Sequence, residues 1–278
     1  MSNRLGKADL HIHSRADDGL ATPREIVEYA ETHTDLDVIA ITDHDAISGA
    51  WEAREIVSRG TYRLQVIVGM EITTRQGHLL ALDLQRPIRM LQDMDATISQ
   101  VHEQGGLCVM PHPLAWFSMG ARQTLMNRLT AHPTTLVYLD GVELFNPSFA
   151  GRVNFAAVQK LNETRWHLAR CGGSDSHSLA TIGSAATTFP LETSTGGHVA
   201  QSTSGPRADF IGLLRRALNE KATDFCGTFW SLNDHTSIAL PQMFRSMIVT
   251  PGARVRRTMG WIRDERNGAA PGQQRGAP

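Results

Sequence analysis

Short apolar runs alternate with amphipathic stretches over most of the chain. The apolar runs are continuous, as in strands buried on both faces of a parallel sheet, and the stretches between them carry apolar residues at helical spacing. This alternation predicts an α/β fold with a mostly parallel sheet, either open or closed. Strands are expected at residues 7–13, 37–42, 64–74, 77–84, 107–113, 140–146 and 167–177, and helices at 22–33, 46–60, 95–106, 121–132, 151–165 and 207–222.

The first predicted helix, residues 22–33, has the clearest start. Thr22 stands at the N-cap position, Pro23 at the first helical position, and Glu25 completes a capping box. Two segments lack the alternation. Residues 191–206 are rich in Ser, Thr and Gly, and from about residue 227 the pattern fades into a tail of disordered composition.

Composition narrows the classes of protein. The 278 residues are 41% hydrophobic with a formal net charge of −1, enough for one large α/β domain or two small ones. No apolar run approaches the ~20 residues that cross a bilayer, and the N-terminus lacks a secretory signal, so no membrane association and a cytoplasmic location are expected. The near-neutral charge argues against a chain-wide surface for long nucleic acid. Cys108, Cys171 and Cys226 are expected to be buried thiols, not a disulfide framework.

Polar residues with coordinating chemistry collect where the predicted strands end. In parallel α/β folds these carboxyl ends line the binding site. One histidine in such a place is commonly a satisfied polar residue, but His, Asp and Glu at successive strand ends indicate one shared site. The residues are His11, His13, Asp43, His44, Glu71, His78 (which opens its strand), His112, Glu143, Asn146, Asp175 and His177.

These residue types favour a metal site. Imidazole and carboxylate together suit zinc, manganese or iron, and the lack of a thiolate among them argues against a structural zinc of the finger type. His11 and His13 are two residues apart, on one face of a strand, so both can reach one ion. About nine candidate ligands exceed what one ion can use, so two or three divalent ions are expected.

The motifs around these residues resemble the PHP (polymerase and histidinol phosphatase) family, and within it the stand-alone metal-dependent phosphoesterases. "DLHIHSRADDG..TP", "AITDHD", "VGMEIT....GHLLAL", "MPHP" and "GGSDSH" follow one another between residues 9 and 177 in the order of the family. The resemblance implies a PHP domain over residues 7–226, a C-terminal extension over 227–278, and a distorted (β/α)7 barrel with a trinuclear metal site at the C-terminal ends of the strands.

The resemblance also implies a distribution of ligands. Of the two neighbouring aspartates, Asp18, which precedes Gly19, matches the family pattern better than Asp17 does. His11, His13, Glu71 and Asp175 would hold the first ion; Glu71 would bridge to a second ion that His78 and His112 also hold; and Asp18, His44 and His177 would hold the third.

The implied reaction is hydrolysis of a small phosphate ester, such as a nucleotide, a sugar phosphate or a short oligonucleotide end. Clustered divalent ions lower the pKa of a bridging water toward ~7 and supply hydroxide, with Glu71 as the bridging ligand. Asp43 would orient a ligand histidine, and either His177 or Asp43 could protonate the leaving alkoxide. Arg15 would grip the phosphate or be a solvated loop residue, and Asn146 would contact substrate or cap the turn before Pro147. His102 is expected on a helix face, outside the site.

Two alternatives remain beside the phosphoesterase. An amidohydrolase-like C–N hydrolase would usually bridge its metals with a lysine, whereas Glu71 stands at the corresponding strand end. A non-catalytic PHP module would usually lack some ligands, and this chain keeps the whole set. The seven arginines from Arg245 to Arg275 belong either to a solvated extension or to an accessory grip on nucleic-acid ends.

Overall fold

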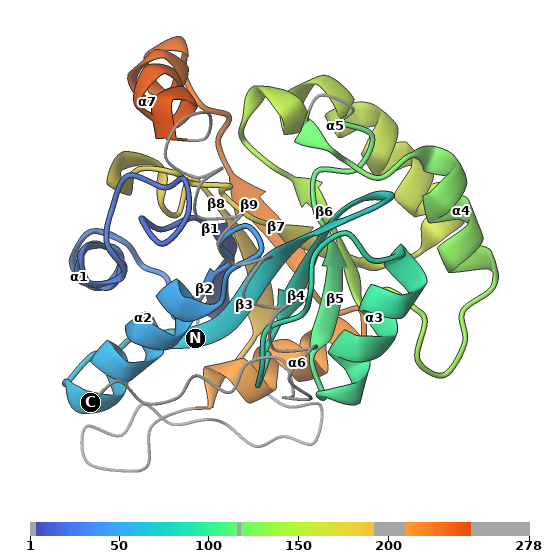
Figure 1. The fold of residues 1–278 in the computed structure, drawn as a ribbon, viewed down its shortest axis with the longest axis horizontal. Coiled ribbons are helices and arrows are strands. Elements are labelled where there is room, and N and C mark those ends of the chain that lie inside the picture. Colours follow the sequence, from blue (N-terminus) through green and yellow to red (C-terminus); the bar gives the residue numbers. More distant parts are fainter. Residues whose placement is uncertain (1–3, 116–117, 192–208, 246–278) are drawn as a thin grey trace, which may run out of the picture.

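The computed structural model describes residues 4–115, 118–191 and 209–245, and in this part of the chain strands and helices alternate as expected (Figure 1). The strands are β1 (Leu5–Ile12), β2 (Val38–Ile41), β3 (Gln65–Thr74), β4 (Gly77–Leu82), β5 (Leu107–Met110), β6 (Gly141–Phe145), β7 (Ala169–Gly172), β8 (Ala185–Pro190) and β9 (Asp224–Gly227). The helices are α1 (Pro23–His33), α2 (Ser48–Arg59), α3 (Met94–Glu103), α4 (Gln123–Ala131), α5 (Phe149–Leu161), α6 (Phe210–Asn219) and α7 (Leu232–Phe244).

One sheet contains all nine strands, in the order β7-β6-β5-β4-β3-β2-β1-β8-β9. Its two ends approach each other, because Gly173 forms a bridge with Ala186 of β8 and the Gly172 N–H donates to Thr187 Oγ1 at 3.0 Å. The expected α/β barrel is therefore confirmed as a nearly closed, barrel-shaped sheet. The strands do not follow a plain repeat of βα units, because β4, β8 and β9 each pair antiparallel with their neighbours.

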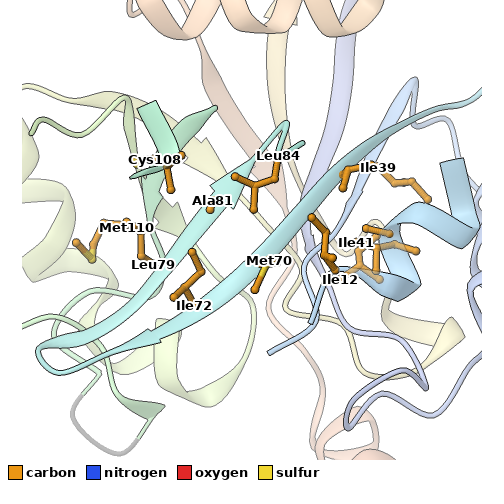
Figure 2. Packing of buried hydrophobic residues seen from close by; sticks show 14 of the residues in the cluster. Ile12, Ile39, Ile41, Met70, Ile72, Leu79, Ala81, Leu84, Cys108 and Met110 are labelled. Atoms are coloured by element: carbon orange, nitrogen blue, oxygen red, sulfur yellow. The ribbon is translucent and has the colours of Figure 1, made fainter. Parts of the chain in front are cut away.

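Each face of the sheet packs against different helices. One set of buried side chains faces α1 to α5, and Figure 2 shows its centre, where Ile12, Ile41, Met70 and Leu79 of four different strands pack together. The opposite face packs on α6 through residues such as Leu10 and Leu214. This inner face, which α6 covers at one end of the strands, carries the candidate site at the other end.

Several local predictions are confirmed. The capping box of α1 is present, with the Thr22 side chain accepting from the Glu25 N–H and the Glu25 carboxylate accepting from the Thr22 N–H. Cys108, Cys171 and Cys226 are free thiols, and the first two are buried as expected, whereas Cys226 is only partly buried, contrary to the prediction. No helix in the described ranges has the length and hydropathy needed to cross a membrane.

Some elements were not predicted. The sequences of β8 (AATTFP) and β9 (DFCG) contain few large apolar side chains, so they gave no strand pattern. Within the expected extension, residues 227–278, α7 begins with a capping box formed by Ser231 and Asp234. The expected loop at 191–206 and the expected tail beyond 245 lie almost entirely outside the described residues.

His102 of α3 forms a charged pair away from the candidate site. Its Nδ1 donates to the Leu136 carbonyl at 2.8 Å, and its Nε2 lies 3.0 Å from Asp140 Oδ2. Both partners are acceptors, so the protonated ring can donate to each of them. Burial opposes that charge, but the hydrogen bonds to Asp140 and Leu136 raise the pKa of His102. With Cys108, His102 and Asp140 are spaced like a metal-binding group, yet both ring nitrogens of His102 already have partners within the protein.

This pair predicts a pH-dependent contribution to stability. Because the pKa of His102 is above its usual 6.5 in the folded protein, the contribution is complete below pH 6.5 and is lost as pH rises through the folded-state pKa. His102→Leu should lower the free energy of unfolding by about 1–3 kcal/mol near pH 6, and by less near pH 9. Urea unfolding at both pH values measures this, with His132→Leu as the exposed control. An equal loss at both pH values would contradict a charged pair.

Candidate metal centre

Glu71 lies at the centre of the candidate site, on the inner face of β3, and is 1% exposed. One carboxylate oxygen, Oε2, is 3.3 Å from His11 Nε2, 3.3 Å from His13 Nε2 and 3.2 Å from His44 Nδ1. The Nε2 atoms of His11 and His13 are themselves only 3.1 Å apart. Two ring nitrogens that approach each other beside a carboxylate oxygen form the kind of donor set that a cation binds.

The other oxygen of Glu71, Oε1, faces a second pair of imidazoles. It is 2.8 Å from His78 Nδ1 and 3.0 Å from His112 Nε2. His78 reaches this point because β3 and β4 form an antiparallel hairpin in which Thr73 pairs with His78. The first residues of β4 therefore lie beside the last residues of β3, and His78 shares a face with Glu71.

A bulge in β1 directs the two histidines of the first strand. Asp9 pairs with Ile39 and Ile12 pairs with Ile41, so three steps along β1 match two steps along β2. Leu10 faces the α6 side of the sheet, whereas Ile12 packs on the other side. The extra residue shifts the alternation and turns His11 and His13 toward the inner face, as bulges near functional sites often do.

The loop after β1 brings Asp18 to His13 and His177. Asp18 Oδ1 lies 3.8 Å from His13 Nδ1 and 3.3 Å from His177 Nε2, and the two imidazole rings stack with centroids 4.2 Å apart. The turn is tight, since a Cβ on Gly19 would lie 2.2 Å from the His13 carbonyl oxygen. Only glycine fits there without moving the loop.

Asp175 joins the first group from the end of β7. Its Oδ1 lies 3.5 Å from His11 Nε2 and 3.4 Å from His13 Nε2. Both Asp175 and His112 have left-handed backbone conformations, with φ of 53° and 25°. Such conformations are uncommon for residues other than glycine and concentrate at functional sites.

The structure brings together every residue predicted from the sequence as a metal ligand. Their ligand atoms form four groups, each with all atoms within 4.8 Å of one another. Of the two neighbouring aspartates, Asp18 belongs to one of these groups and Asp17 to none of them. The groups are His13, Asp18, His44 and His177; His11, His112 and Asp175; His11, His13 and Glu71; and His44, Glu71 and His78.

The arrangement of these nitrogen and oxygen atoms suits a divalent ion better than it suits hydrogen bonds among the side chains. Within the described part of the chain, His44 Nδ1, His78 Nδ1 and His177 Nε2 are buried and form no hydrogen bond. Carboxylate oxygens nevertheless lie 3.2, 2.8 and 3.3 Å from them. Buried polar atoms without hydrogen bonds are costly, and cations between imidazoles and carboxylates would satisfy them.

Electrostatics keep the carboxylates ionised. Burial would raise the pKa of Glu71, but the neighbouring imidazoles of His78 and His44 hold it well below its usual range. Burial opposes a charge on His13, yet hydrogen bonds to Asp175 and Glu71 raise its pKa to about 10. Burial lowers the pKa of His44 well below its usual value, although Glu71 beside it acts in the opposite direction. Without an ion, the cluster therefore keeps protons that a divalent cation would displace.

Glu143 of β6 supports the cluster, a role that the sequence did not reveal. Its Oε1 accepts a hydrogen bond from His11 Nδ1 at 3.0 Å, which leaves His11 Nε2 facing Glu71. Its Oε2 accepts from the backbone N–H of His112 at 2.8 Å and from Asn146 Nδ2 at 2.9 Å. Glu143 stands at a predicted strand end, but its partner His11 is 132 residues away in the chain.

Asn146 is fully engaged inside the protein. Its Nδ2 also donates to Asp175 Oδ2 at 3.2 Å, and its Oδ1 accepts from the Ser148 N–H at 3.0 Å. The expected turn is present, and the amide additionally positions Asp175. With 2% exposure, Asn146 holds a candidate ligand in place and offers little surface to a substrate.

Asp43 and Arg15 are both associated with the loop that follows β1. Asp43 accepts hydrogen bonds from the Ser14 N–H at 2.5 Å and from Ser14 Oγ at 2.7 Å, so it fixes the base of the loop after β1. Among the described residues no histidine hydrogen-bonds to it. Burial raises the pKa of Asp43 to about 6. Arg15 is exposed on the same loop.

Comparison with known proteins identifies the family. The family models for the PHP domain and for a PHP-associated segment match residues 9–141 and 162–201. Over 167 residues the chain is 31% identical to an uncharacterised protein of Methanocaldococcus jannaschii, an alignment that covers 56% of this chain and 91% of that protein. The chain belongs to the PHP family.

Shorter alignments relate the chain to enzymes. It is 39% identical over 80 residues to the 5′-3′ exoribonuclease Rnm of Salmonella typhimurium, which covers 27% of each chain. It is 31% identical over 84 residues to the 3′,5′-nucleoside bisphosphate phosphatase of Chromobacterium violaceum, covering 29% of this chain and 28% of that enzyme. In both cases the chain spans less than a third of the relative.

Solved structures share the fold. A two-domain protein from Bacteroides vulgatus that contains a predicted PHP-like metal-dependent phosphoesterase superposes with a TM-score of 0.58 at 20% identity, over 87% of this chain and 70% of that one. PsfC from Pseudomonas syringae superposes with a TM-score of 0.57 at 15% identity, over 87% and 98% of the two chains. At these identities the likeness concerns the fold.

The position of Glu143 predicts how it contributes to metal affinity. Glu143→Gln keeps the size of the side chain but removes the anionic acceptor of the His11 Nδ1–H. Loss of such a supporting carboxylate should weaken metal binding about 10–100-fold. Titration of metal-free protein with Mn²⁺ in a calorimeter measures the change, and Glu163→Gln, at an exposed glutamate of the turn after α5, is the matched control. Wild-type affinity in Glu143→Gln would contradict this role.

Proposed function

We propose that the protein is a metal-dependent phosphoesterase that hydrolyses small phosphate esters, such as nucleotides, sugar phosphates or short oligonucleotide ends. One observation carries the proposal. The two oxygens of the buried Glu71 carboxylate face separate sets of imidazole nitrogens, His11, His13 and His44 on one side and His78 and His112 on the other. A carboxylate in that position is suited to bridge two cations.

The candidate ligands accommodate two or three divalent ions, for which manganese, zinc and iron are the candidates. His11, His13, Glu71 and Asp175 would hold one ion, Glu71, His78 and His112 a second, and Asp18, His44 and His177 a third. When bound, such ions lower the pKa of coordinated water and neutralise charge on a phosphoryl group.

Hydrogen bonds from neighbouring residues hold these ligands in their orientations. Glu143 holds the His11 ring, and Asn146 holds Asp175. His177 Nδ1 donates to the Asp175 carbonyl at 2.8 Å, so its Nε2 presents a lone pair toward Asp18. That arrangement supports His177 as a ligand instead of a proton donor to the leaving group. Asp43, with both oxygens bonded to Ser14, supports the loop.

The lysines favour phosphate hydrolysis over C–N hydrolysis. The chain has only Lys7, Lys160 and Lys221, and Lys160 is exposed on α5. Lys7 pairs with Asp35, and Lys221 donates to the His167 carbonyl. A lysine that bridges two metals, as in amidohydrolases, is thus replaced by Glu71. The related exoribonuclease and bisphosphate phosphatase also support a phosphate ester as the substrate.

The test is a screen of phosphomonoesters and phosphodiesters with protein of measured metal content. We expect two or three transition-metal ions per chain, and hydrolysis that a chelator abolishes and Mn²⁺ restores. Glu71→Gln and Asp175→Asn should each reduce turnover to background while the fold is retained, because each removes an anionic ligand. Glu163→Gln should match wild type.

Three results would overturn the proposal. They are fewer than one bound ion per chain with none taken up on reconstitution, near wild-type turnover in Glu71→Gln or Asp175→Asn, and hydrolysis of amides without hydrolysis of phosphate esters. Circular dichroism of both variants separates loss of the site from loss of the fold.

A further inference from the structure

The C-terminal helix α7 is attached to the rim of the candidate site at both of its ends. Just before the helix, the Trp230 backbone N–H donates to the Pro147 carbonyl at 3.1 Å, and Trp230 Nε1 donates to Ser184 Oγ at 2.9 Å. Pro147 directly follows Asn146, which holds Asp175. Figure 1 shows α7 standing beyond one end of the barrel, opposite α6.

At the other end of α7, Arg245 reaches the loop that carries Asp18. Its Nη2 donates hydrogen bonds to the Arg15 carbonyl at 2.9 Å and to the Asp17 carbonyl at 2.8 Å. These contacts join residues 228 and 230 positions apart in the chain. One guanidinium nitrogen therefore bonds to two carbonyls at the tip of the turn. The next residue is Asp18, whose carboxylate faces His13 and His177.

The rest of this loop is fixed at its base. Ser14 bonds to Asp43, the Gly19 N–H donates to the Ser14 carbonyl at 3.0 Å, and the Leu20 N–H donates to the His177 carbonyl at 2.8 Å. These contacts hold both ends of the turn. The carbonyls of Arg15 and Asp17 lie between these two ends and accept the hydrogen bonds that Arg245 donates.

We propose that Arg245 is a positioning residue for Asp18. By holding the carbonyls on the approach to Asp18, the guanidinium keeps this carboxylate directed at the group formed by His13, His44 and His177. The inference rests on the proposed function, since it gives α7 a part in holding the third ion. An arginine suits the task because two N–H bonds of one planar nitrogen can reach two carbonyls in a fixed geometry, whereas a lysine ammonium is shorter and freer.

The first measurement is amide hydrogen exchange of the full-length, metal-free protein, followed by mass spectrometry of the segment 14–19. Wild type is compared with Arg245→Gln, Arg245→Lys and the control Arg216→Gln, an exposed arginine on α6. Arg245→Gln should raise exchange in this segment about 10-fold, Arg245→Lys should raise it less, and the control should match wild type.

The second measurement is titration of the same proteins with Mn²⁺. Arg245→Gln should weaken one ion about 10–100-fold and leave the others unchanged, because only the group containing Asp18 loses its support. A general loss of stability would instead weaken all ions together, and thermal unfolding of the metal-free proteins reveals it. Partial recovery in Arg245→Lys supports positioning by the cation.

The outcomes are separable. Unchanged exchange over residues 14–19 in Arg245→Gln overturns the proposal whether or not the protein is a hydrolase. Raised exchange with every Mn²⁺ affinity unchanged also overturns it. A higher KM for a phosphate ester in Arg245→Gln, with unchanged metal content, also overturns it, because that result would mean that Arg245 contacts the substrate. If wild type binds no Mn²⁺, the proposed function fails, and the exchange comparison alone decides whether Arg245 holds the loop.

Discussion

The main constraint on the candidate site is the free-energy cost of burying the Glu71 carboxylate. An ionised carboxylate that is removed from water must be compensated by positive charge and by hydrogen bonds. Glu71 meets this requirement with five imidazoles, which lie within 3.3 Å of one oxygen or the other. Histidines gathered this closely repel one another once protonated, so protons alone serve the cluster poorly. Divalent cations satisfy both kinds of group at once.

Local features of the barrel direct the candidate ligands toward Glu71. The hairpin of β3 and β4 places His78 beside Glu71, and the bulge in β1 turns His11 and His13 toward it. Left-handed backbone at His112 and Asp175 directs these side chains inward after their strands have ended. Around them, Glu143 and Asn146 fix the orientation of ligands from the β1 and β7 ends.

The ligands were predictable from the sequence because they follow a local rule. Most of them come at or near the end of a strand, whereas His78 opens a strand and Asp18 lies on the loop after one. The apolar runs in the sequence mark those strands. The α1 capping box was predictable for the same reason, since its partners Thr22 and Glu25 are three residues apart. The bulge in β1 was not, because it depends on the register with β2.

Contacts between distant segments also escaped prediction. Glu143 was recognised only as a residue at a strand end, and its bond to His11 appears once β1 and β6 are placed in one barrel. Asp43 was expected beside a histidine, but the described contacts join it to Ser14. Arg245 belonged to a segment whose composition suggests a solvated tail, yet α7 carries it back to the loop after β1. Chain entropy disfavours such long-range contacts, and no local pattern announces them.

The central claim is that Glu71 lies between two cations. Anomalous diffraction from crystals of the Mn²⁺-loaded protein, measured on both sides of the manganese absorption edge, locates the ions directly. The account predicts separate peaks on the two sides of the Glu71 carboxylate, one within the group of His11, His13 and Asp175 and the other beside His78 and His112. A map without peaks at these groups, or with manganese only at sites remote from Glu71, would contradict it.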